Sequence, residues 1–161
     1  MIHDSTYFMH IAIKEALKAK AIDEVPIGCV VVKDGKVIAR SFNKREATQD
    51  PTGHAEIKTL QKAAKKLNSW RLEDCDLYVT LEPCIMCSGA IIQSRIRRVY
   101  FGAYDPKGGA FGSSINVLDA NNINHHPEII GGVLEQECSE LLTSYFKEKR
   151  INKKNMKKLD L

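Results

Sequence analysis

The sequence predicts an α/β protein in which one mixed sheet is covered by helices on both faces. Segments with apolar residues at helical spacing alternate with short β-rich runs, in the order α-β-β-α-β-α-β-β-α. The 161 residues, 43% apolar and 27% charged, also have the size and composition of an ordinary globular domain. We therefore expect residues 1–161 to form a single domain.

Local signals place each element in turn. Asp4 or Ser5 can cap the first helix, and Asp34-Gly35 is a pair preferred in tight hairpin turns. Pro83 suits the first position of a helix, where its missing N–H is not needed. Helices are expected at 5–20, 54–67, 83–94 and 134–150, strands at two runs within 27–43, at 76–81, at 98–103 and within 126–133, and loops at 45–53 and 105–114.

Basic residues gather near the C-terminus. Residues 147–158 hold seven basic side chains and one acidic one, whereas the net charge of the whole chain is only +4. Such a cluster favours polyanions, because phosphates that it neutralises release their counterions. The alternative is a solvated helix end with a disordered tail, in which the last residues, 159–161, have no fixed structure.

The sequence indicates a cytoplasmic protein with no membrane segment. No apolar run approaches the roughly 20 residues that cross a bilayer, and the first residues lack the pattern of a signal peptide. The five cysteines are scattered except for Cys84 and Cys87. An odd, scattered set does not suit a disulfide framework, so we expect the close pair to bind a metal or to act in catalysis.

Two short motifs, His54-Ala55-Glu56 and Pro83-Cys84-Ile85-Met86-Cys87, carry the candidate chemistry. Two cysteines three residues apart share one helix face, and the first turn of a helix favours thiolates. His54 can add an imidazole from the start of another helix. Two sulfurs and one nitrogen suit Zn²⁺ and leave a fourth position for water, as in catalytic zinc sites.

Glu56 is expected to be a proton shuttle and not a ligand. Residues two apart on a helix point about 200° apart, so Glu56 and His54 cannot both face the metal. A carboxylate on the substrate side can take a proton from water and pass it on. The alternatives are a redox pair or a structural zinc site. A redox pair does not need His-x-Glu, and no other His or Cys has the spacing of a fourth structural ligand.

Longer stretches resemble a known family. His-x-Glu followed by Pro-Cys-x-x-Cys is the signature of zinc-dependent deaminases. The segments at 24–32, 50–57, 77–91 and 99–113 are similar in order and spacing to bacterial tRNA-specific adenosine deaminases, within the cytidine deaminase-like superfamily. The resemblance implies a three-layer α/β/α fold with a five-stranded mixed sheet. It also implies zinc-dependent deamination of adenosine to inosine at the wobble position of a tRNA anticodon, by a homodimer with one zinc ion per subunit.

The resemblance also assigns roles to individual residues. It makes His54, Cys84 and Cys87 the zinc ligands and Glu56 the proton shuttle. The residues that it places against the base or the anticodon stem-loop are Val25, Pro26, Ile27, Asn43, Asp105, Lys107, Asn124, Phe146 and Arg150.

Several alternatives stay open at this point. Asn43 can instead cap a turn, Lys107 can be a solvated loop residue, and Phe146 can extend the apolar stripe of the last helix into the core. The whole protein can instead deaminate a free nucleobase or nucleotide of the guanine or cytosine type. It can also be a zinc-bearing RNA-binding module without activity.

Overall fold

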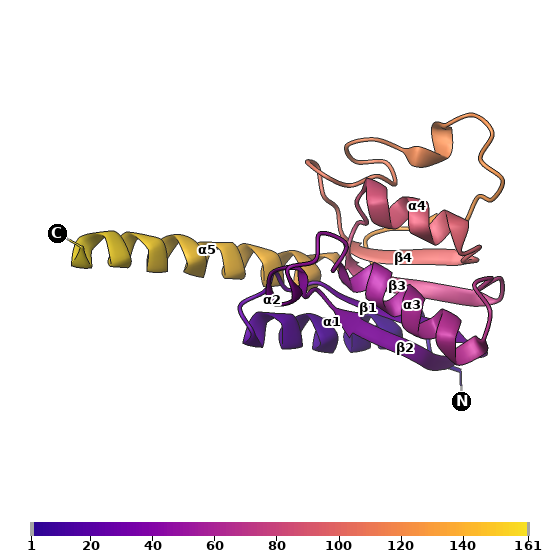
Figure 1. Cartoon of the computed structure of the whole chain (residues 1–161), viewed down its shortest axis with the longest axis horizontal. Coiled ribbons are helices and arrows are strands. Elements are labelled where there is room, and N and C mark those ends of the chain that lie inside the picture. Colours follow the sequence, from indigo (N-terminus) through magenta and orange to yellow (C-terminus); the bar gives the residue numbers. More distant parts are fainter. Residues whose placement is uncertain (1, 161) are drawn as a thin grey trace.

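A computed structural model describes residues 2–160 and shows a five-stranded mixed sheet between two layers of helices (Figure 1). The helices are α1 (Ser5–Ala21), α2 (Arg45–Thr48), α3 (Ala55–Leu67), α4 (Ile85–Gln93) and α5 (Glu135–Leu159), with a 3₁₀ turn at Val117–Asp119. The strands are β1 (Gly28–Lys33), β2 (Lys36–Phe42), β3 (Cys75–Leu81), β4 (Arg98–Ala103) and β5 (Glu128–Ile130). This confirms the α/β fold class expected from the sequence.

The strand order is β2-β1-β3-β4-β5. β1 runs antiparallel to both of its neighbours, whereas β3, β4 and β5 are parallel. The β1–β2 hairpin turns at Asp34 and Gly35, which both have positive φ, as the two central residues of a type I′ turn require. Parallel neighbours need a crossover, and α4 supplies it between β3 and β4.

The burial of β1 shows why the sheet carries helices on both faces. Cys29 and Val31 pack into the apolar layer beneath α3 and α4, whereas Val30 and Val32 pack into the layer beneath α1 and α5. Successive strand residues point to opposite faces, so a strand covered on both sides is apolar throughout. The run Gly28–Val32 is buried at every position.

Three local expectations were wrong. The segment 45–53 is not all loop, because Arg45–Thr48 form the single turn of α2. α4 begins at Ile85 with Cys84 as its N-cap, so Pro83 lies before the helix and not in its first turn. On α3 the buried face is formed by Ala55, Glu56, Thr59, Leu60 and Ala63, whereas the sequence pattern of this helix predicts Ile57 and Leu67 on that face; both are only partly buried.

α5 is longer than the sequence indicated. It does not end near Arg150 but continues to Leu159, and it projects past the end of the sheet (Figure 1). Tyr145 is its last buried residue, and every described residue after it is exposed. Phe146, one candidate for the core, is 45% exposed because no layer covers α5 there. Leu161, part of the expected disordered end, lies outside the described residues.

The described helices include none with the length and apolar character of a bilayer span.

We predict that Gly28→Ala destabilises the fold by at least about 2 kcal/mol, because overpacked sites cannot relax when the neighbour is backbone. A Cβ at residue 28 would lie 2.0 Å from the carbonyl oxygen of Ala12 and 2.4 Å from the amide nitrogen of Ala16, both on α1. Urea unfolding followed by circular dichroism measures the change. Gly35→Asn, at the open hairpin turn, is the control and should cost less than about 1 kcal/mol. Equal stability of the two variants would contradict the prediction.

Candidate metal centre and adjoining groove

His54, Cys84 and Cys87 bring two sulfur atoms and one imidazole nitrogen together. The Nδ1 atom of His54 lies 3.6 Å from Sγ of Cys84 and 3.5 Å from Sγ of Cys87. In a tetrahedral zinc site, bonds of about 2.3 Å to sulfur and 2.0 Å to nitrogen place these atoms about 3.5 Å apart. The three side chains therefore fit one ion, and all of their ligand atoms lie within 4.8 Å of one another.

Two helix starts create this arrangement. His54 is the N-cap residue of α3 and Cys84 is the N-cap residue of α4, and neither side chain caps its own helix. Side chains at N-caps normally accept hydrogen bonds from the first amides; here both are free to face each other. The positive ends of two helix dipoles also favour a thiolate at this point.

The pKa values of the two cysteine thiols are shifted in opposite directions. The hydrogen bond from the Cys87 thiol, aided by His54, lowers the pKa of Cys84 to about 4. The same contact with Cys84, together with burial, raises the pKa of Cys87. Cys84 is therefore a thiolate at neutral pH, whereas Cys87 keeps its proton until a cation displaces it.

Glu56 lies within the protein beside these ligands. It is 4% exposed on the first turn of α3 and does not belong to the three-residue cluster. Burial raises its pKa to about 7, and the nearby Cys84 thiolate acts in the same direction. A carboxyl group with this pKa can both accept and donate a proton at neutral pH.

A small pocket of about 110 Å³ adjoins His54. Val25, Ile27 and Asn43, three residues selected from the sequence, line it together with Arg45 and Ala55. Pro26 is buried between Val25 and Ile27 and does not line the pocket. Three chain segments, 25–27, 43–45 and 54–55, therefore meet beside the candidate metal ligands.

Asn43 is engaged in local hydrogen bonds. Its Nδ2 donates to the carbonyl oxygen of Val25 at 3.2 Å, and its Oδ1 accepts from the amide of Arg45 at 3.2 Å. The turn-capping role that we considered for Asn43 is therefore present. An amide group can make up to four hydrogen bonds, so these two leave capacity on both its oxygen and its nitrogen.

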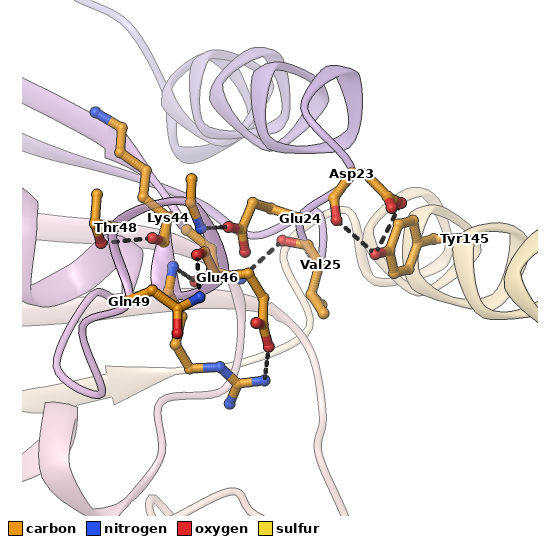
Figure 2. A network of polar contacts seen from close by, with 11 residues as sticks. Asp23, Glu24, Val25, Lys44, Glu46, Thr48, Gln49 and Tyr145 are labelled. Atoms are coloured by element: carbon orange, nitrogen blue, oxygen red, sulfur yellow. Dashed lines mark hydrogen bonds and ion pairs between the residues drawn. The ribbon is translucent and has the colours of Figure 1, made fainter.

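The segment 23–25 is held at three successive residues (Figure 2). The backbone oxygen of Asp23 accepts a hydrogen bond from the hydroxyl of Tyr145 on α5 at 3.0 Å. The carboxylate of Glu24, 2% exposed, accepts from the amide of Ala47 on α2. Val25 accepts from Asn43, as described above. This segment therefore ties α5 to the pocket beside His54.

A large groove of about 1510 Å³ lies between α5 and the loop after β4. Asp105, Lys107, Phe146 and Arg150 line it, as does Val25, which is shared with the small pocket. Three further lining residues were given no individual role from the sequence: Tyr104, and Lys149 and Lys153 of the basic run 147–158. Lys149 and Lys153 lie four and eight residues after Tyr145, about one and two helical turns, so a helix continued past Arg150 places both on its side.

Asn124 is not brought to this site within one chain. The next residue, His125, contacts the carbonyl oxygen of Ile96 through its Nε2, 2.6 Å away. Ile96 precedes β4, whereas Ala103, at the other end of the same strand, lines the groove. Asn124 therefore lies toward the end of the sheet opposite to the His54–Cys84–Cys87 cluster.

Comparison with known proteins identifies the family. Residues 2–150 match the MafB19-like deaminase family. The chain is 49% identical over 158 residues to the tRNA-specific adenosine deaminase of Bacillus subtilis, and the alignment covers 98% of each protein. The chain belongs to the tRNA-specific adenosine deaminases.

Solved structures agree with this membership. A structure from a study of A-to-I editing by tRNA:A34 deaminases at the wobble position of transfer RNA has a TM-score of 0.83 and 49% identity, over 85% of this chain and 99% of that one. The guanine deaminase of Bacillus subtilis has a TM-score of 0.61 and 39% identity, over 63% and 66%. The family resemblance seen in the sequence motifs and the cytidine deaminase-like fold of the tRNA-specific adenosine deaminases are thus confirmed.

We predict that metal affinity rises with pH, by at least about tenfold per unit between pH 6 and 8, because ligands must lose their protons when the ion binds. The raised pKa of Cys87 means that the metal-free chain carries a proton there, which binding releases. The pKa of His54 is also raised, so at the acid end of this range a second proton must leave and the metal affinity depends more steeply on pH. Competition with a chromophoric chelator measures it, and Cys87→Ser should lower the affinity strongly. A pH-independent affinity would contradict the prediction.

Proposed function

We propose that this protein converts adenosine to inosine at the wobble position of a tRNA anticodon, with one zinc ion per subunit. The observation that carries the proposal is the placement of the His54–Cys84–Cys87 cluster beside Glu56, at a pocket that shares Val25 with a basic groove. Membership of the tRNA-specific adenosine deaminases supports it. We also propose that residues 1–161 act as one deaminase domain.

Zinc is the ion that the donor set supports. Two cysteine sulfurs and one imidazole are typical ligands of Zn²⁺, and three protein ligands are the number found in catalytic zinc sites. When bound, such an ion lowers the pKa of a water molecule and so supplies a nucleophile at neutral pH. His54, Cys84 and Cys87 would hold it.

Glu56 would move the protons that deamination requires. Hydrolysis of adenosine consumes water and releases ammonia, so two protons must be moved: one passes from the attacking water to the ring nitrogen N1, where it stays, and the other passes from the new C6 hydroxyl to the departing amine. A buried carboxyl with a pKa of about 7 is suited to both accepting and donating each proton. The position of Glu56 in the first turn of α3 keeps it beside the ligand His54.

The small pocket would receive the adenine base. We assign packing of the base to Val25, Pro26 and Ile27, with Pro26 acting from behind the pocket wall. The unused hydrogen-bond capacity of Asn43 would orient the nucleoside. An anticodon base is presented in a loop and is easier to extrude than a base in a duplex.

The groove would bind the anticodon strand and stem. Lys107, Arg150 and other α5 cations can contact phosphates, and the exposed ring of Phe146 can stack on a base. Asp105 organises the loop by accepting hydrogen bonds from the amides of Lys107 and Gly108, both at 3.1 Å. These contacts lie in one groove because Tyr145 fixes α5 against Asp23.

We further propose a cytoplasmic homodimer. The position of Asn124 supports the homodimer. The family resemblance implies that this residue contacts RNA near the target base, and it lies toward the opposite end of the sheet from the pocket of its own chain, so that contact would be made beside the pocket of a second copy.

The second candidate is deamination of a free nucleobase, which the similarity to a guanine deaminase favours. That relative aligns with only 63% of this chain. A free base also has no use for a groove of about 1510 Å³ lined by α5 lysines.

We predict that the purified protein forms inosine in an anticodon stem-loop with adenosine at the wobble position. Glu56→Ala should lower the rate by at least about 100-fold, the range lost with a general acid–base group, while zinc content stays unchanged. Mass spectrometry of RNA digests and zinc analysis are the measurements. Release of ammonia from free guanine or cytidine, together with an inert stem-loop, would refute the proposal in favour of a base deaminase. Full activity of Glu56→Ala would exclude the proton-shuttle role.

The salt dependence of RNA binding tests the groove. Lys153 and Lys157 line it, whereas Lys154 and Lys158, on the same exposed helix, do not. Lys153→Ala with Lys157→Ala should weaken stem-loop binding and reduce the slope of log K against log salt by about 1.5, because each lost phosphate contact contributes about 0.7 to 0.9. Lys154→Ala with Lys158→Ala is the charge-matched control and should change the slope less. Truncation after Arg150 should flatten the slope further. Equal slopes for both double variants would show only a general charge effect.

A further inference from the structure

The geometry points to Glu82 as a positioning residue, whose buried carboxylate holds the 105–113 loop, one wall of the groove, against the segment that carries the ligand Cys84. Glu82 lies between the last residue of β3 and Cys84 and is 2% exposed. Its relevance to RNA rests on the proposed function, whereas the contact itself does not.

The carboxylate of Glu82 accepts three hydrogen bonds, all from backbone amides of this loop. One oxygen, Oε1, accepts from Asp105 at 3.1 Å. The other, Oε2, accepts from Phe111 at 3.2 Å and from Ser113 at 3.1 Å. A buried carboxylate is stable only when its oxygens accept hydrogen bonds. The loop amides supply these hydrogen bonds to Glu82, and the carboxylate in turn holds the loop in place.

A glycine lets the loop come this close. A Cβ at residue 109 would lie 2.3 Å from Cδ of Glu82 and 2.5 Å from both of its carboxylate oxygens. The amide of Ala110 also donates to the carbonyl oxygen of Pro83 at 2.9 Å. The loop therefore touches two consecutive residues immediately before Cys84.

The consequence concerns the groove wall. Asp105 and Lys107, which line the groove, are at the start of the loop that Glu82 fixes. Cys84 is two residues from Glu82 and begins α4. Glu82 thus fixes the position of Asp105 and Lys107 relative to Cys84. It lines neither the groove nor the small pocket itself.

The test compares Glu82→Gln with Glu15→Gln. In Glu82→Gln one oxygen becomes an NH₂ group that cannot accept, so at least one loop amide loses its partner. Glu15 is the matched control: it is a 3% exposed glutamate on α1 whose partner is Lys18. Gly109→Ala disturbs the same contact from the loop side. The measurements are amide hydrogen exchange without RNA, zinc per chain, and KM and kcat on the anticodon stem-loop.

We expect Glu82→Gln and Gly109→Ala to speed exchange at 105–113 and to raise KM, each by about tenfold, the effect of losing one or two buried hydrogen bonds. Zinc content, exchange in α4 and kcat (within about threefold) should stay near wild type, as should every property of Glu15→Gln.

Three results would overturn the assignment. They are unchanged exchange at 105–113, a uniform rise in exchange that includes α4, and loss of zinc with KM unchanged. If wild-type protein leaves the stem-loop unmodified, the proposed function fails, and the exchange measurement, made without RNA, still decides whether Glu82 holds the loop.

Discussion

The convergence of two helix N-termini is the constraint on which the site depends. α3 and α4 both begin at the same place on one face of the sheet, and their N-cap residues, His54 and Cys84, point at each other. Cys87 completes the triangle from the first turn of α4. The hydrogen bond from the Cys87 thiol, aided by His54, lowers the pKa of Cys84 and makes it a thiolate at neutral pH. Because the three ligand atoms are brought together only when both helices begin at this place, ion binding and the packing of the two helices support each other.

The meeting of His54, Cys84 and Cys87 could be predicted from the sequence because the signals are local. The spacing of Cys84 and Cys87, and the pairing of His54 with Glu56, each lie within one helical turn. The sequence signal for the β1–β2 hairpin was also local, because the pair Asp34-Gly35 determines the type of its turn. The helix boundary at Ile85 was less certain from the sequence, because Pro is common both before a helix and at its first position.

The groove could not be predicted, because it is made by segments that only the fold brings together. Val25, Tyr104 and Lys153 come from three separate parts of the chain. The length of α5 was missed for a different reason: after Tyr145 the helix is exposed on all sides, so no apolar stripe marks its continuation. Its lysines, Met156 and Leu159 nevertheless favour helix intrinsically. Periodicity reports burial, and an unburied helix leaves no periodic signal.

The position of Val25 has a consequence for how such a protein can diversify. Val25 borders both the pocket beside His54 and the groove along α5. A larger residue there would narrow both spaces at once, and a smaller one would widen both. A substitution at residue 25 would therefore change two properties together: the selectivity of the pocket for its ligand and the affinity of the groove for its binding partner. Separate adjustment requires residues that border only one of them, such as Ile27 or Tyr104.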